Sequence, residues 1–167
     1  MPLAVVHFLV AAWATQYFID RVAKEKATYP KYYVLLGGIV GLLPDIDLPI
    51  SAILTRFISY DYGALHNGLT HVVWIPLFFF GIGLLLSSVN KESKKYAFLV
   101  AAGCTIHITL DFFIGGSKMI FYPVSTFIFL GIGPLSGINH FPEMLDAIVF
   151  LGWIVYLYRH DHLSRYY

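Results

Sequence analysis

The sequence predicts an all-α fold, an integral membrane bundle of about five spans that forms one domain over residues 1–167. First, 58% of the residues are hydrophobic and only 13% are charged, whereas soluble domains usually carry ~25% charged residues. Second, the apolar residues gather in long stretches that polar or basic segments separate. The net charge of +1 gives no reason to expect a nucleic-acid partner.

The first apolar stretch runs from Leu3 to about Ile19 and is expected to be a transmembrane helix. No basic segment precedes it, and no convincing small-residue cleavage site follows it. We therefore expect this stretch to be retained as a span and not removed as a signal peptide.

The second apolar stretch is interrupted. It starts at Tyr32 and runs to Leu43, where Pro44 breaks it. At ~1.5 Å per residue, this first part is too short to cross a hydrocarbon core of ~30 Å. Because the stretch continues from Leu48 to Ile58, the sequence predicts one broken helix with the break at Pro44–Asp47. Irregular backbone at membrane depth is tolerated only inside protein or beside a polar cavity, so the break is a candidate site.

Three further spans are expected. They cover His66 to Leu86, Lys95 to about Ile114, and about Met144 to Tyr158. Between the last two, the stretch from Met119 to Pro134 is apolar but contains several proline and glycine residues. It is therefore expected to be either re-entrant or a loop packed over the bundle.

Basic residues predict the orientation of these spans. They lie after the first span, after the third span and in the C-terminal tail: Arg21, Lys24, Lys26, Lys31, Lys91, Lys94, Lys95, Arg159 and Arg165. In contrast, residues 59–65 contain no lysine or arginine, and residues 115–141 contain only Lys118. The positive-inside preference then predicts a multi-pass protein of the cell membrane, with its N-terminus outside and its C-terminus cytoplasmic.

Several ionisable side chains stand in these apolar stretches, all toward the outer side in this topology. They are His7, Asp45, Asp47, His66, His71, His107 and Asp111. A charged side chain at the centre of a membrane helix costs roughly 2.5–3.5 kcal/mol on insertion scales, so these groups need a compensating partner. Since His and Asp are good ligands for divalent cations, we predict a bound metal ion.

The spacing of the histidines suggests how they reach such an ion. His107 and Asp111 are four residues apart, so they share one face of a helix and could bind one ion. A hydrogen-bonded pair between helices is the alternative for this motif. His66 and His71 are five residues apart, which does not place them on one face of a continuous helix. His66 is therefore expected to reach back from a loop while His71 points inward.

The two aspartates at the break have different expected roles. Asp45 is expected to bridge metal ions and is also the candidate catalytic base. Asp47 is expected either to orient a ligand histidine or to cap the following helix. His140 and Glu143, before the last span, are weaker candidates, because acidic residues are common at helix N-termini for dipole reasons alone.

Taken together, these motifs resemble the YdjM-like family, described as membrane-bound metal-dependent hydrolases or LexA-binding inner-membrane-associated hydrolases. The resemblance extends from His7 to Ser125. Its motifs are His7, Leu43–Asp47, His66–His71, His107 with Asp111, and Tyr122-Pro123. The family is distantly similar to the zinc-dependent phospholipase C and single-strand nuclease superfamily, whose members cluster two or three zinc ions with His and Asp ligands.

The resemblance implies a phosphoester hydrolase that binds two or three zinc ions (Zn²⁺), or another divalent metal. The implied ligands are His7, Asp45, His66 or His71, His107 and Asp111. One residue departs from the family pattern, because Asn67 stands where the family has arginine. This removes a cation that could have held a phosphate or a carboxylate, and Arg56 is a candidate substitute.

A site in the outer half of the bilayer favours a lipid or isoprenoid phosphate as substrate, with membrane lipids around it and the oligomeric state left open. Two other classes of protein could use the same His and Asp residues. One is a metal-ion or proton-coupled carrier, which also needs access from the inner face, where the sequence has few polar residues. The other is a scaffold with a structural metal, for which His107→Ala should destabilise the fold rather than only remove activity.

Overall fold

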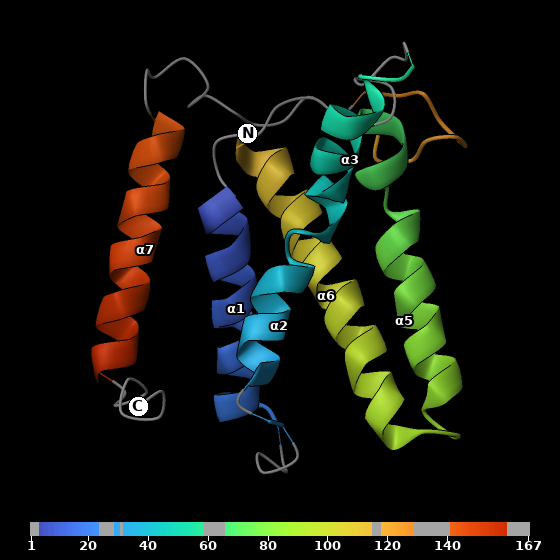
Figure 1. Ribbon diagram of the computed structural model, residues 1–167. Helices are drawn as coiled ribbons and strands as arrows, with labels where there is room; N and C mark the ends of the chain where they lie inside the picture. The colour runs from blue at the N-terminus through green and yellow to red at the C-terminus, as the bar shows by residue number, and fades with distance from the viewer. Residues whose placement is uncertain are drawn as a thin grey trace.

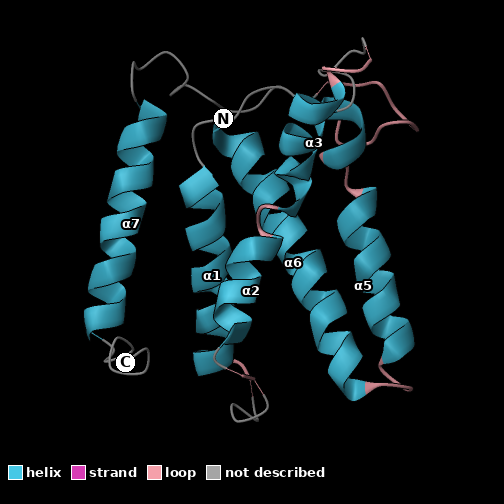
Figure 2. Ribbon diagram, in the orientation of Figure 1, coloured by secondary structure: helices cyan, strands magenta, loops and turns pink. Residues whose placement is uncertain are grey.

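The computed structural model of the chain is a helical bundle (Figure 1). It describes residues 4–23, 29–30, 32–58, 66–114, 118–128 and 141–159. In these ranges the regular secondary structure is helical, with turns and irregular segments between the helices (Figure 2). The predicted all-α class is confirmed.

The first two helices pack against each other along the middle of the bundle. α1 (Ala4–Arg21) buries a face of small and aliphatic side chains against α2 (Tyr32–Val40). The core cluster draws on α1, α2 and the later helix α6 (Lys91–Ile114). Its buried members are Ala12, Ile19, Tyr33, Val34, Val40 and Leu99.

The chain breaks after α2 at the predicted position. Pro44 lies in a short 3₁₀ turn, η2 (Leu43–Ile46), and α3 (Asp47–Leu54) begins at the next residue. The helical segments on the two sides of the break are bent by 60° relative to each other. Proline lacks a backbone N–H and so cannot continue the hydrogen bonds of α2. The break places Asp45 and Asp47 on successive turns inside the protein.

The third predicted span is divided into two helices. η3 (His66–Thr70) is one turn of π-helix, and α5 (Trp74–Leu86) begins only after Val73. α5 runs antiparallel to α6 and packs along it (Figure 1).

The segment 118–128, which follows α6, returns over the start of α5. The amide of Val73 donates a hydrogen bond to the carbonyl oxygen of Ile120 (2.9 Å), and the Trp74 indole donates to that of Tyr122 (3.1 Å). For these residues the loop alternative is confirmed, whereas residues 129–134 of the same predicted stretch lie outside the described part of the chain.

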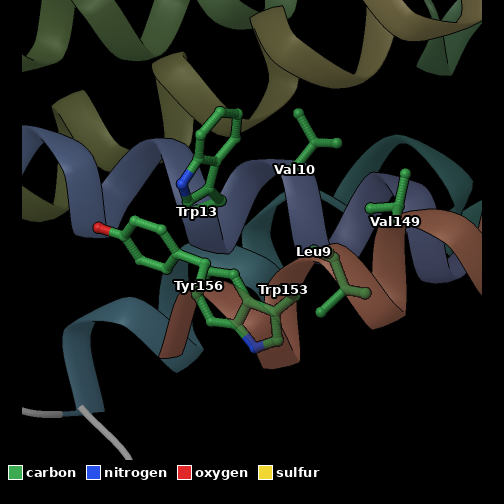
Figure 3. Close-up of a pocket in the computed structure, with 7 residues that line it drawn as sticks. Leu9, Val10, Trp13, Val149, Trp153 and Tyr156 are labelled. Carbon is green, nitrogen blue, oxygen red and sulfur yellow. The ribbon is translucent and has the colours of Figure 1, made fainter. Parts of the chain in front are cut away.

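The last helix, α7 (Phe141–Arg159), packs on α1 at the edge of the bundle (Figure 1). The amide of Val6 in α1 donates a hydrogen bond of 2.8 Å to Asp146 Oδ1. Farther along the two helices, aromatic and aliphatic side chains line an apolar cavity of about 300 Å³ between them (Figure 3).

Fewer helices than predicted have the properties of a membrane span on their own. Among the described helices, α6 alone is long and apolar enough, and the bent pair α2–α3 adds a second if it counts as one span. The expected number of about five is therefore not supported by helix length and composition. α5 has 13 residues, about 20 Å, and the 18 residues of α1 include Asp20 and Arg21. The side chains of α7 are described only from Met144 onward.

The outer surface of the bundle is nevertheless rich in large apolar side chains. Phe57 after α3 is 78% exposed and Leu85 of α5 is 75% exposed, and α7 exposes a run of aliphatic residues. Such extensive apolar exposure is unusual for a soluble monomer and suits contact with lipid.

Candidate metal centre

Eight ionisable side chains meet at the end of the bundle where α1 begins and α6 ends (Figure 1). They are His7, Asp45, Asp47, His66, His71, His107, Asp111 and Lys118. All are buried except Asp45, whose side chain is 11% exposed. The structure thus brings together every residue of the predicted ligand set, from four separate parts of the chain, and Lys118 joins them from a fifth.

Two histidines face each other at the middle of this cluster, with the Nε2 atoms of His71 and His107 only 3.1 Å apart. On the far side of each ring, Nδ1 contacts a backbone carbonyl oxygen, that of His66 for His71 (2.9 Å) and that of Gly41 for His107 (2.7 Å). Because a carbonyl only accepts, each Nδ1 must carry the hydrogen. In its neutral form each ring would therefore direct the lone pair of Nε2 at the other ring, an arrangement that a bound cation would stabilise.

Two carboxylates lie beside these nitrogens. Asp111 Oδ2 is 3.0 Å from Nε2 of His71 and 3.7 Å from Nε2 of His107. Asp45 Oδ1 is 3.5 Å and 3.6 Å from the same two atoms. This oxygen of Asp45 is buried and makes no hydrogen bond within the described residues. Imidazole nitrogens and carboxylate oxygens at this spacing fit a divalent metal ion.

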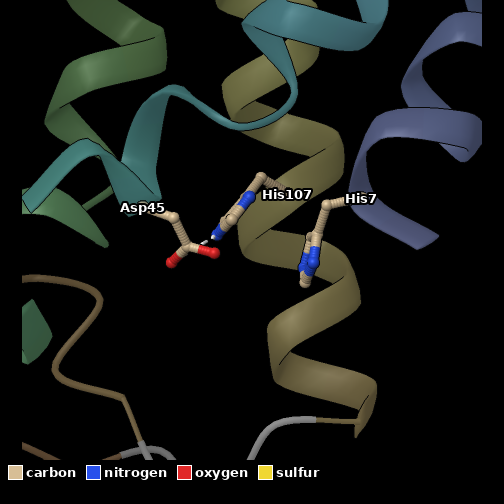
Figure 4. A group of neighbouring side chains, drawn as sticks. All are labelled: His7, Asp45 and His107. Carbon is tan, nitrogen blue, oxygen red and sulfur yellow. Dashed lines mark ion pairs between the residues drawn. The ribbon is translucent and has the colours of Figure 1, made fainter. Parts of the chain in front are cut away.

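His7 joins the cluster from the beginning of α1. Its Nε2 is 3.3 Å from Asp111 Oδ1, and its ring stacks on that of His107 with 4.0 Å between the centroids. Figure 4 shows His7 and Asp45 on either side of His107, and these three residues place ligand atoms within 4.8 Å of one another. His7 is therefore close enough to share an ion with the central pair.

Asp47 orients a histidine. The Nδ1–H of His66 donates to Asp47 Oδ2 at 2.7 Å, and the hydroxyl of Thr70 lies 3.2 Å from the same oxygen. A carboxylate in this position fixes the ring and makes its other nitrogen more basic. The predicted capping role is not seen, because the residue at the N-cap of α3 is Ile46 and no side chain caps that end.

The π-turn changes one expectation from the sequence. A π-turn joins residues five apart, and here it places the rings of His66 and His71 with their centroids 4.2 Å apart. Together with Asp45, the two histidines form a further group whose ligand atoms lie within 4.8 Å. The expectation of separate approaches from a loop and from a helix was wrong, because it assumed α-helical spacing.

Three weaker candidates are not placed by the structure. Asn67 lies in η3 and Glu143 in α7, but neither side chain is among those described. His140 lies outside the described residues. Arg56, the suggested substitute for the arginine of the family pattern, is exposed after the end of α3.

Lys118 is a member of the cluster that the sequence analysis did not select. It is 3% exposed, and its Nζ lies 2.9 Å from Asp111 Oδ2 and 3.4 Å from His66 Nε2. The pairing with Asp111 compensates for the desolvation of the ammonium group. Its one signal in the sequence was its position as the lone lysine or arginine in residues 115–141.

Gly41 allows α1 and α2 to come close enough to build this centre. A Cβ at Gly41 would lie 2.5 Å from the Cβ of Ala11 and 2.8 Å from the carbonyl oxygen of His7. The second of these atoms belongs to the backbone, so a substitution must move the helices apart. The same movement would shift the Gly41 carbonyl that accepts the hydrogen bond of His107.

Gly41→Ala is therefore expected to lower the free energy of unfolding by roughly 1–3 kcal/mol, as overpacking does in well-packed cores. It should also weaken metal binding. Thermal unfolding in detergent and metal titration measure the two effects. Gly81→Ala is the control, since a Cβ there has open space around it. Because Gly81 lies within α5, this variant should not lower the free energy of unfolding, and it should leave metal binding unchanged. Equal behaviour of the two variants would contradict the proposed close contact.

Comparison with known proteins agrees with this arrangement. The chain matches the model of the family described as YdjM inner membrane protein over residues 1–163, a span that includes every residue of the centre. No curated protein and no solved structure is significantly similar to it. The family description agrees with the apolar outer surface of the bundle. The chain therefore belongs to the YdjM inner membrane protein family.

Proposed function

We propose that this protein is a membrane-embedded, zinc-dependent hydrolase that cleaves a phosphoester in a lipid or isoprenoid-type substrate. The observation that carries the proposal is the pair of Nε2 atoms of His71 and His107, 3.1 Å apart, with the carboxylates of Asp45 and Asp111 next to them. A mixed set of imidazole and carboxylate donors suits zinc, although other divalent ions accept the same ligands.

The residues of the centre have two roles in this proposal, metal binding and proton transfer. A bound zinc ion supplies a Lewis acid that lowers the pKa of a bound water to about 7 and polarises a phosphoryl oxygen. His71, His107 and Asp111 would hold the ion. Asp45 is the proton acceptor for the attacking water, because it is the most exposed carboxylate of the centre and its Oδ1 makes no hydrogen bond within the described residues.

The surroundings of Asp45 support a lipid-like substrate. A cavity of about 370 Å³ opens on this residue, between the start of α1, the end of α2 and the break. Its other lining residues are apolar, among them Ile39, Leu42, Ile46 and Leu48. An acyl or isoprenoid chain would gain free energy by burying its surface here, while its phosphate group would lie at the Asp45 end of the cavity, next to the proposed metal ion.

We further propose that five helical passes cross the membrane with the centre in the outer half, the N-terminus outside and the C-terminus cytoplasmic. With α2 and α3 taken as one bent pass, successive passes alternate in direction (Figure 1). Basic residues lie at the end of the bundle away from the centre, where Arg21 ends α1, Lys91 begins α6 and Arg159 ends α7. The bent α2–α3 pair and η3 with α5 each count as one pass in this arrangement.

The alternative function, a metal-ion or proton-coupled carrier that uses the His and Asp residues of the centre, is less well supported. It would need a polar path on the inner side of the centre, between α1, α2 and α6. The described buried residues there are mostly apolar, such as Ala12, Leu99 and Cys104. The polar exceptions, Thr15 and Gln16, bond within α1, to the Ala11 carbonyl oxygen and to Asp20 respectively.

The test is metal content and turnover on one detergent-purified preparation. We expect the protein to retain zinc by elemental analysis and to release inorganic phosphate from an isoprenyl monophosphate or from phosphatidate. Chelation should abolish this activity and added zinc should restore it. A soluble aryl phosphate serves as the control and should be cleaved much more slowly. Protein that purifies without any divalent transition metal would contradict the proposal.

A further inference from the structure

The proposed hydrolase does not yet explain Lys118, a buried ammonium group at the metal centre. We infer that the Lys118 ammonium takes the place of one metal ion, so that the centre holds a single divalent ion and not the two or three that the family resemblance implies. The inference rests on the proposed metal centre but not on the proposed hydrolysis.

The contacts of Lys118 occupy the position between Asp111 and His66, beside the central histidine pair, that a second ion could take. Its Nζ is 2.9 Å from Asp111 Oδ2 and 3.4 Å from His66 Nε2. Because His66 donates its Nδ1–H to Asp47, Nε2 carries the lone pair that faces the ammonium. A zinc ion bound to these two atoms would stand about 2.0–2.2 Å from each, within the space that the Lys118 nitrogen fills.

The charges of the centre also indicate a single divalent ion. Its described groups include the carboxylates of Asp45, Asp47 and Asp111, one ammonium and four imidazoles. With neutral imidazoles, two negative charges remain uncompensated, and one divalent ion balances them. A second ion would leave an excess of positive charge in a buried site, which is unfavourable at low dielectric.

The same geometry selects between His66 and His71 as the ligand. His71, His107 and Asp111 place ligand atoms within 4.8 Å of one another, next to Asp45. His66 instead contacts Lys118 through its Nε2. The single ion is therefore bound at the His71–His107 pair, and Lys118 and His66 form the neighbouring position.

The experiment counts zinc ions per chain by elemental analysis of purified protein. Lys118→Met keeps the length and the apolar stem of the side chain and removes its charge. We expect about one ion in the unmodified protein and about two in Lys118→Met, since loss of the ammonium vacates the position between Asp111 and His66 and leaves a third negative charge there. Lys95→Met is the control, because that ammonium pairs with Glu92 at the other end of α6 (2.8 Å). It should not change the count.

Two or more ions in the unmodified protein would overturn the inference, and so would a folded Lys118→Met with an unchanged count. If that variant does not fold, the unmodified protein is loaded with Mn²⁺ and examined by electron paramagnetic resonance. A spectrum of isolated ions supports the inference, and a spin-coupled pair overturns it. An unmodified protein that binds no metal would overturn both the inference and the proposed function. One ion without hydrolysis would contradict the hydrolase alone.

Discussion

His107→Ala is expected to abolish zinc binding and hydrolysis while leaving the helical bundle assembled. His107 contributes to two of the groups that could hold an ion, one with His7 and Asp45 and one with His71 and Asp111. Loss of a partner that only orients a metal ligand already costs 10–100-fold in affinity, so loss of a ligand should cost more than ~100-fold. Elemental analysis and phosphate release measure the two effects on the same preparation.

The same variant separates an enzyme from a scaffold. A structural metal predicts that His107→Ala lowers the thermal unfolding midpoint as much as chelation of the unmodified protein does. A catalytic metal predicts lost activity in protein that remains folded and monodisperse. Thr109→Ala, on the exposed side of α6, is the control and should retain zinc and turnover. A His107→Ala protein with full zinc content would show that the centre is not built as described.

Asp45→Asn is expected to lower the rate of hydrolysis by about 10²–10⁴-fold while the ion remains bound. The amide preserves the shape of the side chain but cannot accept a proton from the attacking water. Retention of zinc depends on Asp111, whose Oδ2 is nearer to His71 Nε2 (3.0 Å) than Asp45 Oδ1 is (3.5 Å). Initial rates and zinc content, measured together, distinguish loss of the base from loss of the metal.

Asp20→Asn is the matched control, because Asp20 lies at the far end of α1 and accepts a hydrogen bond from Gln16. It should retain both activity and zinc. An Asp45→Asn protein that loses zinc with its activity would assign this carboxylate to metal binding instead of proton transfer. Full activity in Asp45→Asn would place the general base elsewhere.

The sequence identified most members of the centre because ionisable residues are conspicuous in an apolar chain. Pro44 also marked the break, since the effect of proline on a helix is local. The π-turn was not predictable in this way, because nothing in His66–Thr70 alone distinguishes it from an α-turn. Lys118 was missed for a similar reason. Its partner Asp111 is near in sequence but lies in α6, whereas Lys118 follows the end of that helix, and its second partner, His66, lies 52 residues away.

Fewer helices than expected are long and apolar enough to span a membrane on their own, because hydropathy does not show where helices begin. Residues 66–73 contain no proline, lysine, arginine, aspartate or glutamate that would mark a boundary of the third stretch, yet they form the π-turn and a bend before α5 starts at Trp74. In a membrane, such backbone is stable only where protein groups satisfy its hydrogen bonds. Thr70 does so here, with its hydroxyl 2.9 Å from the carbonyl oxygen of His66.

The way in which the ligand histidines are oriented affects how this family can diverge. His71 and His107 are held by main-chain carbonyls, which a side-chain replacement does not delete. His66 is held by the side chain of Asp47, which one nucleotide change can remove. Point mutation can therefore reshape the His66 side of the centre step by step, while the orientation of the central pair is inherited with the path of the backbone itself.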